Sequence, residues 1–243
     1  MKAEMITSLV LVLTAAASAQ AEPHGLVLHA ADKTAVFARL YPATGKAKAI
    51  ILMFHQARSN MAEYAPIAPR VAKMGFDCLT IDQRAGDGMW GVKNKTAAQF
   101  SSEQNYLQAY PDLEAALAWA KLRHYQKIIA WGSSYSSSLT LRLASEHPEI
   151  AAALVFSPGE YFDQDGLVAG WNQKIKVPVL FAWTQEEADK GGMKLFQSAK
   201  RAGDVLVVGP QGVHASSTLR ADRNPNGAEY YWERVEKFLK AVG

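Results

Sequence analysis

Residues 127–144, KIIAWGSSYSSSLTLRLA, decide the fold of this chain. The apolar run at 127–130 predicts a strand, and the periodicity of 139–144 predicts a helix. Between them there is room only for a tight turn, with Ser134 at its apex and Gly132 two residues earlier. So sharp a turn strains the apex and needs small neighbours, a demand that Gly132 meets and Ser136 meets less well.

The same turn also suggests a chemical role for Ser134. A helix that starts just after the apex directs its first N–H groups, and a partial positive charge, at any anion formed there. A serine presented in this way is placed to act as a nucleophile. The alternative is an ordinary serine-rich loop, because Ser133, Ser136, Ser137 and Ser138 crowd the same segment.

Composition excludes several other classes of function. The chain has 243 residues, of which 49% are hydrophobic, enough for a sizeable core. The net charge of +3, without a long cationic run, argues against a nucleic-acid partner. Cys78 is the single cysteine, so no intrachain disulfide can form, and its apolar surroundings predict a buried thiol. Neither metal-ligand spacing nor a dinucleotide-binding glycine motif is present, so we predict no metal or cofactor.

The N-terminus has the pattern of a signal peptide, predicted over residues 1–21. Lys2 precedes an apolar stretch at 5–17, and small-x-small cleavage sites follow at 17–19 and 19–21. The apolar stretch falls short of the ~20 residues that span a bilayer. We therefore predict a secreted or periplasmic protein without a stable membrane span after cleavage.

Apolar runs alternate with helical patterns along the rest of the chain, which predicts an α/β fold with a mostly parallel sheet covered on both faces. The predicted strands are 27–29, 34–40, 49–54, 76–81, 127–131, 151–156, 177–183 and 205–208, the first two as an antiparallel pair. The predicted helices are 61–74, 111–122, 136–146, 187–202 and 227–241. We expect one domain over residues 22–243, with its site at the carboxyl ends of the strands.

A serine nucleophile needs a base and an acid, which should follow it in the order acid, then histidine. His214 lies in the loop directly after the last predicted strand, where the base belongs. The loop after the preceding strand supplies Glu187, which has the expected spacing. The sequence leaves four alternatives open for the acid: Glu186, Asp189, Glu160 and Asp163.

Acyl transfer at Ser134 would also need donors for a developing oxyanion. The backbone N–H of Tyr135, just after the serine, is one candidate. The second would come from the turn after the strand at 49–54, either from Gln56 or from Ala57. His55, beside them, is expected to pack or hydrogen-bond under the site.

With these residues the chain resembles an α/β-hydrolase, most similar to the dienelactone-hydrolase-like esterase branch, over nearly everything after residue 21. The matching positions are His55 and Gln56, the segment 82–86, Ser134, Glu187 and His214. Two departures are Ser136 for the usual second glycine and a glutamate where aspartate is commoner. The resemblance implies two-step acyl transfer by Ser134, His214 and Glu187, and we find no insertion large enough for a cap domain.

We therefore predict a serine hydrolase of a small carboxylic ester, while thioester, lactone and peptide bonds stay open. The loops 86–110 and 158–176 either form an apolar substrate pocket or are anchored by their large apolar side chains, namely Met89 and Trp90 in the first and Tyr161, Phe162 and Trp171 in the second. Asp82 and Arg84 are expected to form an ion pair. The alternative function is a hydrolase-like protein that binds a ligand or partner without turnover. The sequence leaves the oligomeric state open.

Overall fold

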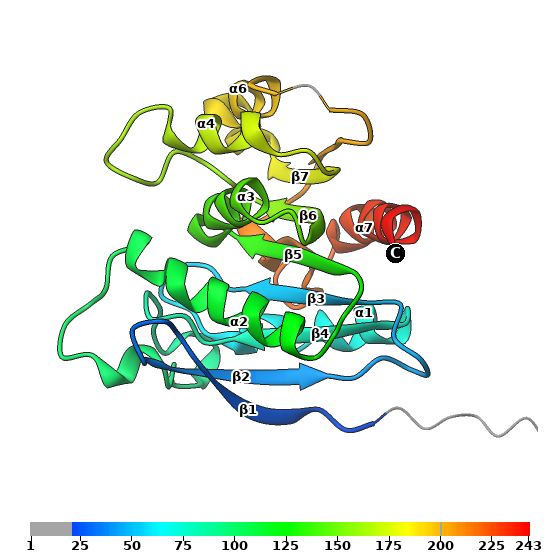
Figure 1. Cartoon of the computed structure of the whole chain (residues 1–243). Coiled ribbons are helices and arrows are strands. Elements are labelled where there is room, and N and C mark those ends of the chain that lie inside the picture. Colours follow the sequence, from blue (N-terminus) through cyan, green and yellow to red (C-terminus); the bar gives the residue numbers. More distant parts are fainter. Residues whose placement is uncertain (1–20, 200) are drawn as a thin grey trace, which may run out of the picture.

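The computed structural model describes residues 21–199 and 201–243, so residues 1–20 of the predicted signal peptide lie outside the described residues. Eight strands form one sheet in the order β1-β2-β4-β3-β5-β6-β7-β8 (Figure 1). They are β1 (His24–His29), β2 (Ala35–Tyr41), β3 (Ala49–Phe54), β4 (Phe76–Ile81), β5 (Ile128–Ser133), β6 (Ile150–Phe156), β7 (Val179–Thr184) and β8 (Val205–Gly209). The predicted strands are confirmed.

The sheet is antiparallel at one edge and parallel elsewhere. β1 pairs with β2, and β2 with β4, in antiparallel fashion. Every pair from β4 through β3, β5, β6 and β7 to β8 is parallel. All residues of β3 and β5 are buried, as expected for interior strands covered on both faces.

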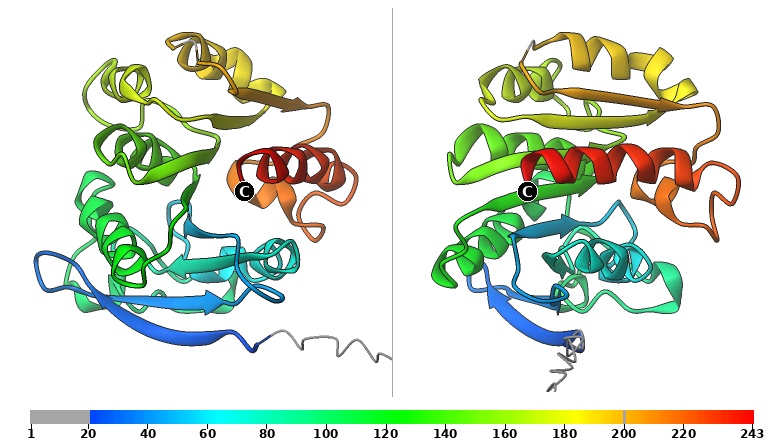
Figure 2. Two further views of the ribbon diagram at one scale, coloured as in Figure 1. Left: turned by 45° about the vertical axis from the view of Figure 1, so that its right-hand side comes forward. Right: turned by 90° about the vertical axis from the view of Figure 1, so that its right-hand side faces the viewer.

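Helices cover both faces of the sheet, and Figure 2 shows α7 on the side opposite α3 and α4. Residues of α2, α3, α4 and α6 pack into one apolar cluster, whereas residues of α1 and α7 pack into a second. The α-helices are α1 (Ala68–Lys73), α2 (Tyr110–Leu122), α3 (Tyr135–Glu146), α4 (Leu167–Lys174), α5 (Gln185–Glu187), α6 (Met193–Gln197) and α7 (Ala228–Val242). The other helical turns are η1 (Met61–Tyr64), η2 (Met89–Gly91), η3 (Ala97–Gln99), η4 (Leu107–Ala109), η5 (Ala188–Gly192) and η6 (Ala215–Leu219).

Two predicted helices are wrong as continuous elements. The helix expected at 61–74 is split into η1 and α1, because Pro66 and Pro69 lack the N–H groups that a continuous helix needs. The helix expected at 187–202 is divided into α5, the wide turn η5 and α6, which ends at Gln197. Gly191, at φ 145°, interrupts it there.

The parallel strands bring the loops that follow them to one edge of the sheet. The segments after β3, β4, β5, β6, β7 and β8 therefore meet although they are far apart in the sequence. Among the described residues, no helix is both long and apolar enough to cross a membrane. Cys78 lies buried in β4, and burial raises the pKa of its thiol well above the usual value.

Candidate active site

Ser134 stands between β5 and α3 in the strained backbone that the tight turn predicts. Its φ and ψ are 59° and −126°, a conformation that non-glycine residues rarely adopt, and it is only 5% exposed. Gly132 permits the reversal, because a Cβ there would lie 2.5 Å from the Cα of Ser137 and 2.6 Å from the carbonyl oxygen of Ser136. We call residues 132–136 the elbow.

The elbow serine is connected to His214 and Glu187. The Nε2 atom of His214 lies 2.8 Å from the Oγ of Ser134, and its Nδ1 lies 2.5 Å from Oε1 of Glu187. A carboxylate at Nδ1 favours the tautomer with the proton on that nitrogen, which leaves Nε2 free to accept the serine proton. The three side chains come from the ends of β5, β8 and β7, so only the folded sheet brings them together.

Glu187 is held as a carboxylate by several donors. Its Oε2 accepts hydrogen bonds from the N–H of Thr184, at 3.0 Å, and the hydroxyl of Ser157, at 2.8 Å. Burial favours the neutral acid, but the hydrogen bonds from His214, Thr184 and Ser157 outweigh it and lower the pKa of Glu187. Glu187 is therefore ionised near neutral pH.

None of the four alternative acids forms a hydrogen bond or an ion pair with His214. Glu186 pairs with Lys190 at 2.5 Å, and Asp189 accepts a hydrogen bond from Gln185. Glu160 accepts the N–H groups of Val168 and Ala169 at the start of α4. Asp163 lines an open cleft between residues 103–107 and 161–164.

Ser157 is a site residue that sequence reasoning missed. Its hydroxyl donates to Glu187 and accepts the N–H of Ala215 at 2.9 Å, so it connects the loop of the acid with the loop of His214. Its φ is 53°, in the left-handed region. The signal was available, because Ser157 directly follows β6 at the strand edge where functional residues gather.

The two candidates for the second oxyanion donor differ in the structure. The N–H of Gln56 already donates to Oε2 of Glu63 at 2.8 Å, and its side-chain amide donates to Ser217. The N–H groups of Ala57 and Tyr135 have no hydrogen-bond partner among the residues that the structure describes. Ala57 and Tyr135 are thus the amides free to receive an oxyanion.

His55 is a buried structural residue, as predicted. The N–H of Gln83 donates to its Nε2 at 2.8 Å, so Nδ1 carries the proton and donates to the carbonyl oxygen of Gln56, also at 2.8 Å. Burial lowers the pKa of His55 to about 4. The imidazole is neutral and supports the turn that carries Ala57.

The expected ion pair between Asp82 and Arg84 is wrong. Both carboxyl oxygens of Asp82 accept backbone N–H groups, those of Met61 at 2.9 Å and Lys95 at 2.7 Å. Arg84 instead pairs with the buried Asp112 of α2, at 2.7 Å, and with Asp32 of the β1–β2 turn. Main-chain donors already satisfy Asp82, so the guanidinium takes its partners from α2 and the β1–β2 turn.

An open cleft of about 600 Å³ lies between two of the loops that the sequence singled out. Its walls include Tyr106 and Leu107 on one side and Tyr161 and Phe162 on the other. The ring of Tyr106 stacks on that of Tyr135 with centroids 4.4 Å apart, which places the cleft beside the elbow. The phenol of Tyr161 donates to the carbonyl oxygen of Ser157 at 2.7 Å, and burial raises the pKa of Tyr161 to about 12.

The large apolar residues of these loops divide between the two predicted roles. Phe162 packs on Trp171 with centroids 5.5 Å apart, and the indole N–H of Trp90 donates to Ser59. Trp90 and Trp171 therefore anchor the loops, whereas Tyr161 and Phe162 line the cleft. Met89 is exposed and does not line this cleft.

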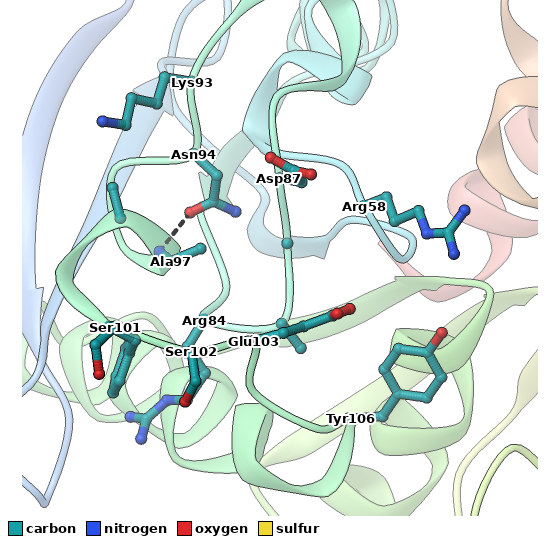
Figure 3. Close-up of a pocket in the computed structure, with 14 residues that line it drawn as sticks. Arg58, Arg84, Asp87, Lys93, Asn94, Ala97, Ser101, Ser102, Glu103 and Tyr106 are labelled. Carbon is teal, nitrogen blue, oxygen red and sulfur yellow. Dashed lines mark hydrogen bonds between the residues drawn. The ribbon is translucent and has the colours of Figure 1, made fainter.

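A second cavity, of about 360 Å³, also has Tyr106 in its wall (Figure 3). The side chains of Arg58 and Lys93 lie at opposite sides of it and point away from one another. Arg84, a third cation in its wall, is already paired with carboxylates. Within residues 21–199 and 201–243, no group of three His, Cys, Asp or Glu side chains could hold a metal ion.

An eight-stranded, mostly parallel sheet with a serine at a strand–helix turn, followed by an acid and a histidine after later strands, defines an α/β-hydrolase. Residues 36–243 match the sequence model of the dienelactone hydrolase family, and the chain belongs to this family of hydrolases.

Solved structures show the same fold. An esterase from Pyrococcus furiosus gives a TM-score of 0.71 at 18% identity and covers 91% of this chain and 94% of its own. A dienelactone hydrolase from Anabaena variabilis gives 0.69 at 15% identity, over 92% of this chain and 99% of its own. An acylaminoacyl peptidase from Pyrococcus horikoshii gives 0.68 at 13% identity, over 92% of this chain and 42% of its own. No curated protein matches the sequence.

Proposed function

We propose that this protein is a serine hydrolase that cleaves a small carboxylic ester, with Ser134 as nucleophile, His214 as base and Glu187 as the acid. The observation that carries the proposal is the continuous hydrogen-bonded chain from Ser134 through His214 to Glu187. Membership of a hydrolase family supports it. We also propose that residues 1–21 direct export to the periplasm or the medium.

The reaction proceeds in two steps. The Oγ of Ser134 attacks the ester carbonyl while its proton passes to Nε2 of His214, and the amides of Ala57 and Tyr135 receive the oxyanion. The C–O bond of the ester then breaks, and the alcohol leaves with the proton from His214. Water attacks the acyl-enzyme with the same base, which restores Ser134 and releases the carboxylic acid. Glu187 orients the imidazole and stabilises its cationic form.

The cleft between Tyr106 and Tyr161 suits the acyl or alcohol part of the substrate. Its walls combine aromatic and aliphatic side chains with polar ones, and its open mouth favours small esters that are only partly enclosed. Comparison of nitrophenyl esters with thioester, lactone and aminoacyl substrates would decide which bond is cleaved fastest. We expect the esters to have the highest kcat/KM.

Covalent labelling with a fluorophosphonate tests the proposal directly. Wild-type protein should be labelled, Ser134→Ala should not, and His214→Ala should react at least ~100-fold more slowly because the serine has lost its base. Ser145→Ala is a matched control, since Ser145 lies on α3 outside the site and bonds only its own helix. Folded wild-type protein that resists the probe, or labelling that survives Ser134→Ala, would overturn the proposal in favour of a binding protein without turnover.

A further inference from the structure

A second carboxyl group, that of Glu63 in η1, lies beneath the elbow and takes no part in the proposed proton transfers. Glu63 is fully buried, and among the described residues no Lys, Arg or His side chain forms an ion pair with its carboxyl group. Burial raises its pKa to about 7, although hydrogen bonds from Ser133 and Gln56 oppose this effect. An unpaired buried carboxyl is costly, so its hydrogen bonds show what it does for the fold.

Glu63 joins three segments that surround Ser134. Its Oε2 accepts the N–H of Gln56 at 2.8 Å, in the turn after β3, and its Oε1 accepts the hydroxyl of Ser133 at 2.5 Å, in the elbow. The same Ser133 oxygen accepts the N–H of Ser216 at 3.0 Å, two residues after His214. One carboxyl thus fixes the oxyanion turn, the elbow and the histidine loop relative to one another.

The hydrogen bond to Gln56 has a geometric consequence for its neighbour. Peptide units are planar, so the hydrogen bond from the Gln56 N–H fixes the orientation of the peptide between His55 and Gln56. It thereby restricts the orientation of the following peptide, between Gln56 and Ala57. That next peptide carries the N–H of Ala57, which has no partner among the described residues. The Gln56 amide is turned toward Glu63, and the Ala57 amide is the one left available for the site.

Resting on the proposed function, we propose that Glu63 is the positioning residue of the oxyanion hole. It holds the Ala57 amide and the elbow in the relative geometry that the tetrahedral intermediate needs. Glu63 does not touch the substrate, and it acts through Gln56 and Ser133. Ground-state binding in the cleft does not depend on this alignment, whereas stabilisation of the oxyanion does.

Glu63→Gln tests this role, because the amide has nearly the same volume but turns one of the two acceptor oxygens into a donor. We expect kcat for a nitrophenyl ester to fall by about 10- to 100-fold, with KM within about twofold of wild type. Glu149→Gln is the matched control, since Glu149 is exposed and pairs with Lys121 away from the site.

Inhibitor binding distinguishes a misaligned oxyanion hole from a general disruption of the site. A trifluoromethyl ketone, which forms a tetrahedral adduct with Ser134, should lose affinity in parallel with kcat, whereas an unreactive ether of the same shape should bind as it does to wild type. Glu63→Asp keeps the carboxyl group, but its side chain is too short to hold both donors. It should also lose ketone affinity while ether binding stays unchanged. This variant tests the role of Glu63 if Glu63→Gln does not fold. Unchanged kcat and ketone affinity, or equal losses for ketone and ether, would overturn the role of Glu63. Failure of the proposed function would appear separately, as unlabelled wild-type protein.

Discussion

Glu187 and Glu186 are adjacent in the sequence, yet only one of them reaches His214. Thr184 starts α5 with a capping box, in which its side chain accepts the N–H of Glu187 while the Glu187 side chain accepts the N–H of Thr184. Successive residues of a helix point about 100° apart, so this arrangement directs Glu187 inward and leaves Glu186 to pair with Lys190 in solvent. Helix capping at Thr184 therefore distinguishes Glu187 from Glu186, and the fold then brings His214 to Glu187.

Replacing Glu187 by Gln should reduce kcat for a nitrophenyl ester by about 100-fold or more, whereas Glu186→Gln should change it by less than about twofold. The amide cannot stabilise a cationic imidazole and can favour the wrong tautomer of His214. Steady-state kinetics of the two variants side by side checks this. Equal losses, or a larger loss in Glu186→Gln, would assign the acid elsewhere.

At the scale of elements, the elbow depends on close contact between β5 and α3. Gly132 leaves no room for a side chain, and Ser136, which takes the place of a second glycine, is small enough to fit. Its hydroxyl donates to the carbonyl oxygen of His55 and accepts from the side-chain amide of Gln83 at 2.8 Å. The serine thereby ties the elbow to the turns after β3 and β4, which a glycine could not do.

Gly132→Ala should destabilise the protein by about 3 kcal/mol or more and abolish labelling of Ser134, because the new methyl group would overlap backbone atoms that cannot move independently. Gly170→Ala is the control. Gly170 lies within α4, where a Cβ would meet no atom within 4 Å apart from its chain neighbours and its own helix backbone, so alanine there should be neutral or stabilising by up to about 1 kcal/mol. Denaturant unfolding measures both, and similar stabilities for the two variants would contradict the close-contact explanation.

At the scale of the whole molecule, Arg84 connects segments on three elements. Its guanidinium, 5% exposed, binds Asp112 of α2, which is fully buried, and Asp32 of the β1–β2 turn, which is 45% exposed. The N–H of Arg84 also donates to Asp112 at 2.8 Å. Arg84 thus connects the β1–β2 turn, at the antiparallel edge of the sheet, to α2. This connection lies close to the loops that line the site.

Asp112→Asn should lower the free energy of unfolding by about 3 kcal/mol, because it leaves the buried guanidinium short of its main partner. Asp32→Asn should cost less than about 1 kcal/mol, since water screens that exposed partner. Chemical denaturation of both variants at pH 7 gives the comparison. If Asp32→Asn proves the more damaging, the exposed pair and not the buried one holds this edge of the sheet.

The sequence by itself determined the alternation of strands and helices, the eight strands and the turn that carries Ser134. Each of these follows from local patterns of apolar residues, glycine and proline. It also predicted a histidine after the last strand and a group of acids after the two strands before it. Prolines at 66 and 69 and the glycines at 191 and 192 carried the local signal for the two broken helices, although the apolar periodicity around them predicted continuous ones.

Only the tertiary structure decided which side chains meet. The selection of Glu187 among five acids, the engagement of the Gln56 amide by Glu63 and the pairing of Arg84 with Asp112 all depend on contacts between separate segments of the chain. Local sequence patterns do not encode such contacts, because they depend on strand order and on which buried donors already have acceptors. Periodicity and turn chemistry fix the elements, whereas the sheet order and the satisfaction of buried polar groups fix the site.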